Sequence, residues 1–222
     1  MFALNSGSDI LLIFAKQPLP GQVKTRLCPP LTPTQAALFH ACSLADTLEQ
    51  VSRSRRFCPV LCYSGDAAYF QQHFPQLPRL PQGPGDLGAR LTAAFAAMQA
   101  LGAQRVCAIG SDSPDLPLVQ IESAFDVLSE SDFVTIPALD GGYVLIGSRR
   151  EPSAAFAGIA WSSEKVLAQT VARVESAGFS CRQLAAWEDV DDEAALSRLA
   201  RRPGALRAQR FARRCLRELA EI

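Results

Sequence analysis

The chain has 222 residues, of which 48% are hydrophobic, so it is long and apolar enough to bury a full core as one domain, residues 1–222. Its formal net charge is zero, which excludes a protein that binds nucleic acid through an overall basic charge. Seven cysteines are scattered along the chain, and the apolar run at residues 10–15 is too short for a signal sequence or a membrane span. We therefore expect a soluble, cytoplasmic protein with no transmembrane segment.

Short apolar runs, typical of strands buried on both faces, alternate with longer segments whose apolar residues repeat at helical spacing. The strand patterns lie at residues 9–14, 57–63, 105–110, 132–138, 143–148 and 180–185. The helical patterns lie at residues 33–51, 66–74, 87–102, 118–130 and 162–178, and further helices follow residue 192. This order predicts an α/β fold in which a mostly parallel sheet carries helices on both faces.

The last predicted helix, about residues 203–220, is basic and amphipathic. From residue 198 onward the chain has eight arginines against two glutamates. Four of the arginines recur at helical spacing opposite an apolar stripe: Arg207, Arg210, Arg214 and Arg217. We interpret them as the solvated face of a docked helix and expect no nucleic-acid partner; binding to nucleic acid or to an anionic membrane is the alternative that this charge leaves open.

Polar clusters follow three of the predicted strands. The segment "AKQPLPGQVKTR" follows residues 9–14, "GSDSPD" ends the strand at residues 105–110, and "LDGG" follows residues 132–138. Open sheets of this kind bind ligands at the carboxyl ends of their strands, near the point where the strand order reverses. We therefore expect these clusters to lie close together although they are far apart in the sequence.

Two acidic clusters predict a metal site. Asp112 and Asp115 directly follow a strand, while Asp189 and Asp191 precede a helix. Carboxylates suit Mg²⁺ or Mn²⁺, which takes one or two of them and completes its shell with phosphate and water. We expect Asp112 to bind the ion first, with Asp189 or Asp191 as the donor from a second element. Capping of the following helices is the alternative for Asp115 and for the second cluster.

The loop after the first strand is long and cationic. Lys24 and Arg26 can reach phosphate oxygens, Lys16 stands at the strand end, and Gly21 lets the backbone approach a ligand closely. Together with a metal on aspartates, this loop predicts a polyphosphate ligand. The chain contains neither GxxxxGK[ST] nor GxGxxG, which disfavours a P-loop kinase or a dinucleotide-binding dehydrogenase.

Asp140, Gly141, Gly142 and Tyr143 lie between two predicted strands. The Asp-Gly pair is a strong signal for a hairpin turn. The alternative is that the glycines let a sugar ring lie against the backbone, with Asp140 as the catalytic residue that binds sugar hydroxyls or acts as general base toward an acceptor hydroxyl.

Four more residues are candidates for contacts around the same ligand. Asp86 and Arg90 either contact the nucleotide or cap and decorate a helix. Trp161 and Ser162 either form a sugar- or acceptor-binding rim or, as we prefer, supply a buried anchor and an N-cap.

Six segments occur in order between residues 14 and 196: "AKQPLPGQVKTRL", "GDLGARL", "GSDSPDLP", "DGGYVLIG", "WSS" and "DVDDEAAL". In this combination the chain resembles a bacterial family of the GT-A glycosyltransferase superfamily, the nucleotide-diphospho-sugar transferases, some of whose members are named for arsenosugar biosynthesis. The resemblance implies a single-domain GT-A nucleotide-binding fold, with Asp112 and Asp115 at the DxD-like metal motif. Two residues separate these acids instead of one, and we favour Asp112.

The resemblance implies a metal-dependent glycosyltransferase that uses a nucleotide-diphospho-sugar donor and an acceptor that the sequence does not identify. The "KTRL" segment is also similar to 2-phospholactate guanylyltransferase and to the phosphate loop of sugar-phosphate nucleotidyltransferases, so nucleotidyl transfer with release of pyrophosphate is the alternative. A non-catalytic nucleotide-binding module is the third hypothesis.

Overall fold

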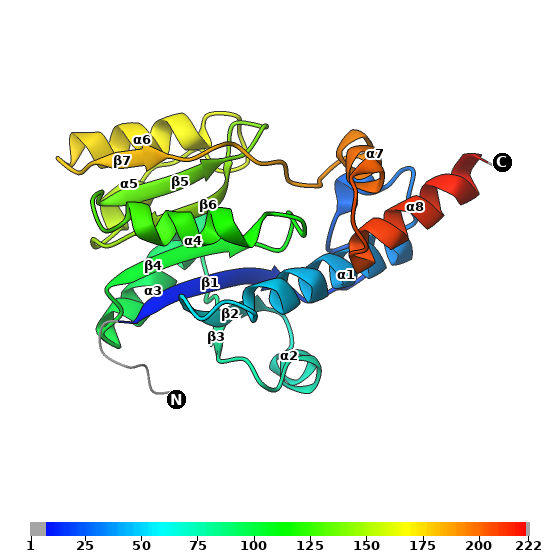
Figure 1. Ribbon diagram of the computed structural model, residues 1–222, viewed down its shortest axis with the longest axis horizontal. Helices are drawn as coiled ribbons and strands as arrows, with labels where there is room; N and C mark the ends of the chain where they lie inside the picture. Colours follow the sequence, from blue (N-terminus) through cyan, green and yellow to red (C-terminus); the bar gives the residue numbers. More distant parts are fainter. Residues whose placement is uncertain (1–7, 221–222) are drawn as a thin grey trace.

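A seven-stranded sheet forms the centre of the computed structural model, which describes residues 8–220 (Figure 1). The strand order is β3-β2-β1-β4-β6-β5-β7. β6 runs antiparallel to β4 and β5, and the other neighbouring pairs are parallel, so the expected mostly parallel sheet is confirmed. The strands are β1 (Asp9–Lys16), β2 (Cys58–Ser64), β3 (Arg79–Pro81), β4 (Arg105–Gly110), β5 (Phe133–Pro137), β6 (Tyr143–Ser148) and β7 (Cys181–Gln183).

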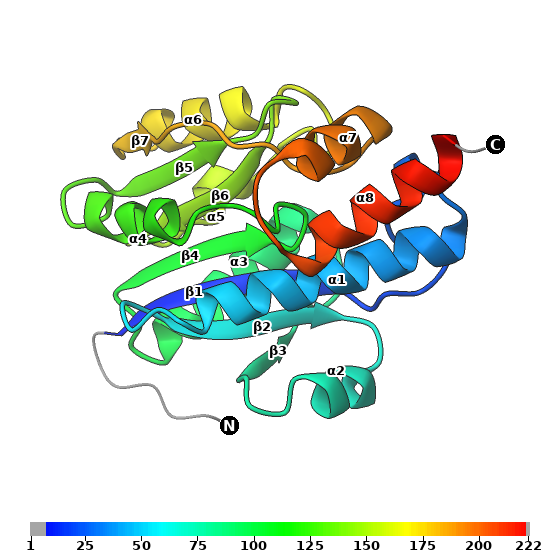
Figure 2. The ribbon, with the colours of Figure 1, turned by 45° about the vertical axis from the view of Figure 1, so that its right-hand side comes forward.

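Helices cover both faces of this sheet (Figures 1 and 2). α1 and α4 pack on one face, while α3, α5 and α6 pack on the other. The helices are η1 (Thr25–Leu27, a 3-10 turn), α1 (Pro33–Val51), α2 (Ala67–His73), α3 (Leu87–Ala100), α4 (Leu118–Val127), α5 (Ser153–Phe156), α6 (Val166–Ser176), α7 (Glu193–Arg201) and α8 (Arg207–Ala220). Within residues 8–220, no helix is long and apolar enough to cross a membrane.

β1 is buried between β2 and β4, which explains its continuous apolar sequence. Leu12, for example, pairs with Val60 on one side and Ala108 on the other, and it has no exposed surface. A strand that is covered by helices on both faces needs apolar side chains at every position instead of at alternate positions.

Some boundaries differ from those that the sequence predicts. β3 lies in a segment rich in turn signals, and it is detectable only from its pairing with β2, because an edge strand that ends at Pro81 has no buried apolar run. The short helix α5 has no pattern of its own, and α6 begins at Val166 instead of residue 162. α8 begins at Arg207, after Pro203 and Gly204, which do not continue a helix.

α7 and α8 pack beside α1 at the end of the sheet where β1 terminates (Figure 2). Phe39 of α1, Leu199 of α7 and Phe211 of α8 are buried in this contact. It fixes residues 187–192, the segment that enters α7, close to the carboxyl ends of the central strands.

The strand order reverses between β1 and β4. The chain passes from β1 through α1 to β2 on one side, and later through α3 to β4 on the other side. Loops that leave β1 and β4 in opposite directions open a crevice between them, which is where open α/β sheets bind their ligands.

Candidate active site

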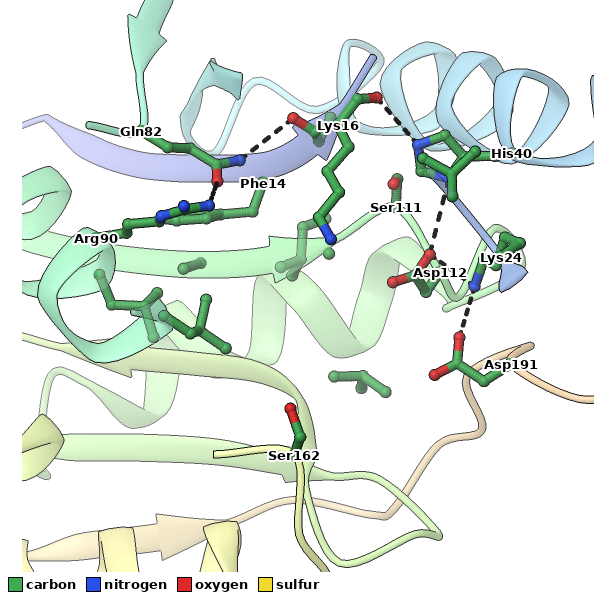
Figure 3. A pocket seen from close by; sticks show the side chains of 18 of the residues that line it. Phe14, Lys16, Lys24, His40, Gln82, Arg90, Ser111, Asp112, Ser162 and Asp191 are labelled. Atoms are coloured by element: carbon green, nitrogen blue, oxygen red, sulfur yellow. Dashed lines mark hydrogen bonds and ion pairs between the residues drawn. The ribbon is translucent and has the colours of Figure 1, made fainter. Parts of the chain in front are cut away.

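A cavity of about 540 Å³ lies at this reversal point (Figure 3). The ends of β1 and β4, residues 22–26 of the first loop, the start of α3 and part of β6 line it. Of the residues singled out from the sequence, those that line the cavity are Lys16, Lys24, Arg26, Arg90, Asp112, Tyr143, Ser162 and Asp191. The clusters that follow β1 and β4 therefore converge as expected, whereas none of residues 139–142, the third cluster, lines the cavity.

Lys24 is at the centre of the charged part of the cavity. Its ammonium lies 2.7 Å from Asp112 Oδ1 and 2.7 Å from Asp191 Oδ1, and it donates to the Val190 carbonyl at 2.7 Å (Figure 3). Only 4% of its side chain is exposed. Burial alone would lower the pKa of Lys24, but the charges of Asp112 and Asp191 more than offset it, so the pKa is raised and the ammonium stays charged.

The two acidic segments are joined by their backbones as well. The Val190 N–H donates to the Asp112 carbonyl at 2.9 Å. The three oxygens that surround the Lys24 ammonium (Asp112 Oδ1, Asp191 Oδ1 and Val190 O) are here called the oxygen cradle. All three are hard ligands of the kind that Mg²⁺ and Mn²⁺ prefer.

The donor set fits a divalent ion that is held partly by its substrate. Among residues 8–220 there is no group of three or more His, Cys, Asp or Glu side chains that could hold a metal by themselves. Mg²⁺ is usually bound through one or two carboxylates plus phosphate and water, and the oxygen cradle supplies two carboxylates next to an open cavity. Asp112 and Asp191 are therefore the residues that would hold the ion.

His40 is a buried neighbour of this cluster that we did not identify from the sequence. Its Nε2 lies 3.1 Å from the Lys16 carbonyl, and its Nδ1 lies 4.0 Å from Asp112 Oδ1. Burial lowers the pKa of His40, so the neutral ring donates from Nε2 and leaves Nδ1 as an acceptor without a partner in the described chain. One histidine inside the helix α1 carries no sequence signal of this placement.

Asp189 differs from Asp191 in its environment. It does not line the cavity. Burial, with the nearby charges of Asp191 and Asp140, raises its pKa to about 6. Of the two candidates in this segment, Asp191 is the one that contacts Lys24.

Asp115 makes a different set of contacts. Its Oδ2 lies 2.6 Å from Arg202 Nη1, and its Oδ1 accepts a 3.3 Å hydrogen bond from Trp187 Nε1. Arg202 also reaches Glu188 Oε2 at 2.5 Å. The structure thus places Asp115 in an ion-pair network that ties its loop to the segment before α7, and not in the oxygen cradle.

The first loop presents further positive charge to the cavity. Arg26 is 67% exposed and lies 3.7 Å from Asp191 Oδ2, while the Lys16 side chain points into the cavity (Figure 3). Gly21 has φ +76° in an open part of the loop, and Lys24 itself has a left-handed backbone (φ 49°), which is uncommon for a residue with a side chain.

Arg90 of α3 and Gln82, which follows β3, form the wall of the cavity on the side away from Lys24 (Figure 3). Arg90 donates to the Gly85 carbonyl at 2.9 Å and lies 3.4 Å from Gln82 Oε1. Gln82 is buried and donates to the carbonyls of Ala15 and Cys62, which fixes the orientation of its amide. Gln82 was not predicted, because a single glutamine in a turn-rich segment has no distinctive pattern.

Asp86 caps α3 by accepting a 2.8 Å hydrogen bond from the Ala89 N–H, and it does not line the cavity. Trp161 packs against Gly88 and Phe156, as the structural interpretation expects. The N-cap interpretation of Ser162 is wrong, because α6 begins at Val166 with Lys165 at the N-cap position. Ser162 instead reaches the cavity from a left-handed backbone with φ 64°.

Residues 138–142 form the turn between β5 and β6. The Gly142 N–H donates to Asp140 Oδ1 at 3.0 Å, and the Ala138 N–H donates to the Gly142 carbonyl. Gly141 (φ +91°) lies so close to the Glu164 backbone that an added Cβ would be 2.1 Å from the Glu164 oxygen. The hairpin interpretation is therefore correct for the backbone, while Tyr143, just after the turn, lines the cavity.

Comparison with known proteins agrees with this architecture. Residues 47–163 match the model of the family described as "Uncharacterized protein conserved in bacteria (DUF2064)". The chain belongs to this family. Its structure is also similar to that of a "putative nucleotide-diphospho-sugar transferase" from Desulfovibrio desulfuricans G20, with 32% sequence identity, a TM-score of 0.88, and 96% of this chain and 98% of that chain covered. The predicted family resemblance and fold are confirmed.

More distant structures share the fold. A cytidylyltransferase from Leptospira borgpetersenii matches with 13% identity and a TM-score of 0.58, covering 97% of this chain and 94% of that one. Rv0371c from Mycobacterium tuberculosis H37Rv, in a complex with manganese, matches with 18% identity and a TM-score of 0.55, covering 87% and 98%. No curated protein matches the sequence.

Proposed function

We propose that this protein is a transferase that depends on Mg²⁺ or Mn²⁺ and moves a sugar from a nucleotide-diphospho-sugar to an acceptor. The observation that carries the proposal is the oxygen cradle of Asp112, Asp191 and Val190, which faces a cationic cavity at the reversal point of the sheet. The relative from Desulfovibrio desulfuricans, described in the same terms, supports the class of donor.

In this proposal Asp112 and Asp191 hold the ion, and Asp189 lies behind Asp191. The bound ion would supply positive charge to neutralise the diphosphate. Lys16 and Arg26, at the open side of the cavity, are placed to donate to phosphate oxygens and to stabilise the charge that develops on the leaving diphosphate.

Tyr143, Ser162 and Arg90 line the part of the cavity away from the oxygen cradle, and we place the nucleoside and the sugar there. Gly141, next to Gly142, lets the β5–β6 turn lie directly against the Glu164 backbone, two residues beyond Ser162. Asp140, on the same turn, is the candidate to orient the sugar or to accept a proton from the acceptor hydroxyl. Trp161 supports the start of α3 from behind.

Nucleotidyl transfer is the second candidate, because the cytidylyltransferase from Leptospira borgpetersenii has the same fold over nearly the whole chain. The same cations would then hold a nucleoside triphosphate, and a phosphorylated substrate would attack its α-phosphate. The two candidates differ in the product that is released, nucleoside diphosphate or pyrophosphate.

One experiment tests both. The purified protein is incubated with Mn²⁺ and either nucleotide-diphospho-sugars or nucleoside triphosphates with sugar phosphates, and binding is followed by thermal shift before the released product is measured. Asp112→Asn should abolish metal-dependent nucleotide binding, whereas Asp66→Asn, which keeps an N-cap at α2 away from the cavity, should not change it. Equal nucleotide affinity of wild type and Asp112→Asn, with and without a chelator, would contradict the proposal.

A further inference from the structure

The Lys24 ammonium has no donor left for a ligand. An ammonium carries three N–H protons, and the three oxygens of the cradle accept them at 2.7 Å each. The side chain is 4% exposed, so water and solutes have little access to it. As the chain stands in this structure, Lys24 binds its own carboxylates and cannot bind a phosphate.

The oxygens that hold Lys24 are also the oxygens available to a divalent ion. Asp112 and Asp191 provide the two carboxylates on the cavity wall, and Val190 adds a carbonyl. The ammonium contacts only the Oδ1 atoms of the two aspartates, so each carboxylate keeps a second oxygen for a metal ion. The ammonium and the ion cannot both occupy the space among the three cradle oxygens, however, because their like charges would lie in contact. One cation has to leave this space before the other can enter it.

We propose that Lys24 is a resident cation in the metal site, which the divalent ion displaces and which then binds the phosphate of the incoming nucleotide. The inference rests on the proposed metal-dependent binding of nucleotides at this cavity. It explains how two carboxylates stay next to each other in the free protein, since the ammonium compensates their charge until the metal arrives. It also makes binding of metal and nucleotide cooperative, because the nucleotide gives the displaced ammonium a new partner.

The proposal predicts that Lys24→Met raises the affinity for Mn²⁺ and lowers the affinity for the nucleotide. Lys24→Met empties the cradle and leaves its carboxylates uncompensated, so Mn²⁺ should bind the nucleotide-free protein roughly tenfold more tightly, the equivalent of one charge-assisted hydrogen bond that no longer has to be broken. The same variant should bind a nucleoside diphosphate more weakly in the presence of Mn²⁺, because the phosphate has lost its ammonium. A lysine with a purely structural role would instead weaken both affinities.

Mn²⁺ affinity is measured from the electron paramagnetic resonance signal of free Mn²⁺, and nucleotide affinity by calorimetry. Lys165→Met is the matched control, since it removes one exposed positive charge from a lysine that does not line the cavity. Its Mn²⁺ affinity should change by less than about twofold, because an exposed charge is screened by water.

A measurement on the wild-type chain protects the test against a variant that fails to fold. Acetylation by a lysine-specific reagent, read by mass spectrometry, should be slow at Lys24 in the metal-free protein, faster with Mn²⁺ alone, and slow again when a nucleoside diphosphate is added. Lys165, which is exposed and does not line the cavity, is the internal reference for reagent activity.

The failures are distinguishable. Two results together would refute the displacement: a Mn²⁺ affinity of nucleotide-free Lys24→Met that is equal to or lower than that of wild type, and acetylation of Lys24 that Mn²⁺ leaves unchanged. The proposed function would still stand if the wild-type protein binds Mn²⁺ together with nucleotide. If wild type binds no Mn²⁺ under any condition, both are refuted.

Discussion

Arg202 connects the two acidic segments of the candidate site, and its removal gives a quantitative test of how that site is held together. Its guanidinium lies 2.6 Å from Asp115 and 2.5 Å from Glu188, with its Cζ 5.5 Å from the Trp187 ring centroid. The two carboxylates are 11% and 6% exposed. Removing one partner of a buried pair typically costs 3–5 kcal/mol; because Glu188 keeps Arg198 at 2.6 Å, we expect about 3 kcal/mol for Arg202→Met.

That loss corresponds to a fall in Tm of about 6–12 °C for a chain of this size. The assay is chemical denaturation followed by circular dichroism, with Arg201→Met as the matched control. Arg201 is the last residue of α7, directly before Arg202; it is exposed, and its side chain has no hydrogen bond or ion pair among the described residues. Its loss should therefore change the free energy of unfolding by at most about 0.5 kcal/mol. Equal unfolding midpoints for the two variants would refute the assignment of Arg202 as the link between two buried carboxylates.

Two further substitutions test other parts of the fold. Gly141→Ala should destabilise the protein by roughly 3 kcal/mol or more, because the added Cβ would meet the Glu164 backbone at 2.1 Å. Gly21→Ala, which has a similar φ but free space, should cost only about 1–2 kcal/mol of backbone strain. Similar unfolding midpoints for the two variants would contradict the predicted clash. Asp132→Asn tests a pH dependence. The hydrogen bond from Arg150, with other contacts, holds the pKa of Asp132 below its ordinary value in the folded protein. The free energy of unfolding that this carboxylate contributes is therefore present above the unfolded-state pKa of about 3.9 and is lost as the pH falls toward the folded-state pKa. The difference in free energy of unfolding between wild type and this variant should therefore shrink between about pH 5 and pH 3, and a constant difference would argue against the ion pairs.

The fold could be predicted from the sequence because its signals are local. The buried central strands are continuous apolar runs, and α1 begins with the Thr-x-x-Gln pattern of a capping box, in which Thr32 and Gln35 bond reciprocally. β3 was missed because an edge strand of three residues has no pattern distinct from a turn. The carboxyl-end rule then brought distant loops to one cavity without any knowledge of contacts.

The contacts within the site could not be predicted in the same way. The sequence favours Asp112 over Asp115 for the metal, but it gives no sign that Asp115 pairs with Arg202, which is 87 residues away along the chain. His40 and Gln82 line the cavity from a helix and a turn, where neither the residue type nor its spacing indicates a ligand site. Such roles follow from tertiary packing, which short-range patterns do not encode.

Each acidic segment has one carboxylate that contacts Lys24 and one that contacts Arg202. In "SDSPD" Asp112 faces the cavity and Asp115 faces Arg202; in "WEDVDD" Asp191 faces the cavity and Glu188 faces Arg202. Lys24 therefore links the two acids on the cavity side, and Arg202 links the two on the protein side, where Arg198 also contacts Glu188. Arg202 lies between two buried carboxylates, while Lys24 borders the cavity, so the Lys24 pair is the one for which we propose exchange of the cation for a metal. Loss of Arg202 should consequently lower stability, and loss of Lys24 should alter metal and nucleotide affinity with less effect on the unfolding midpoint.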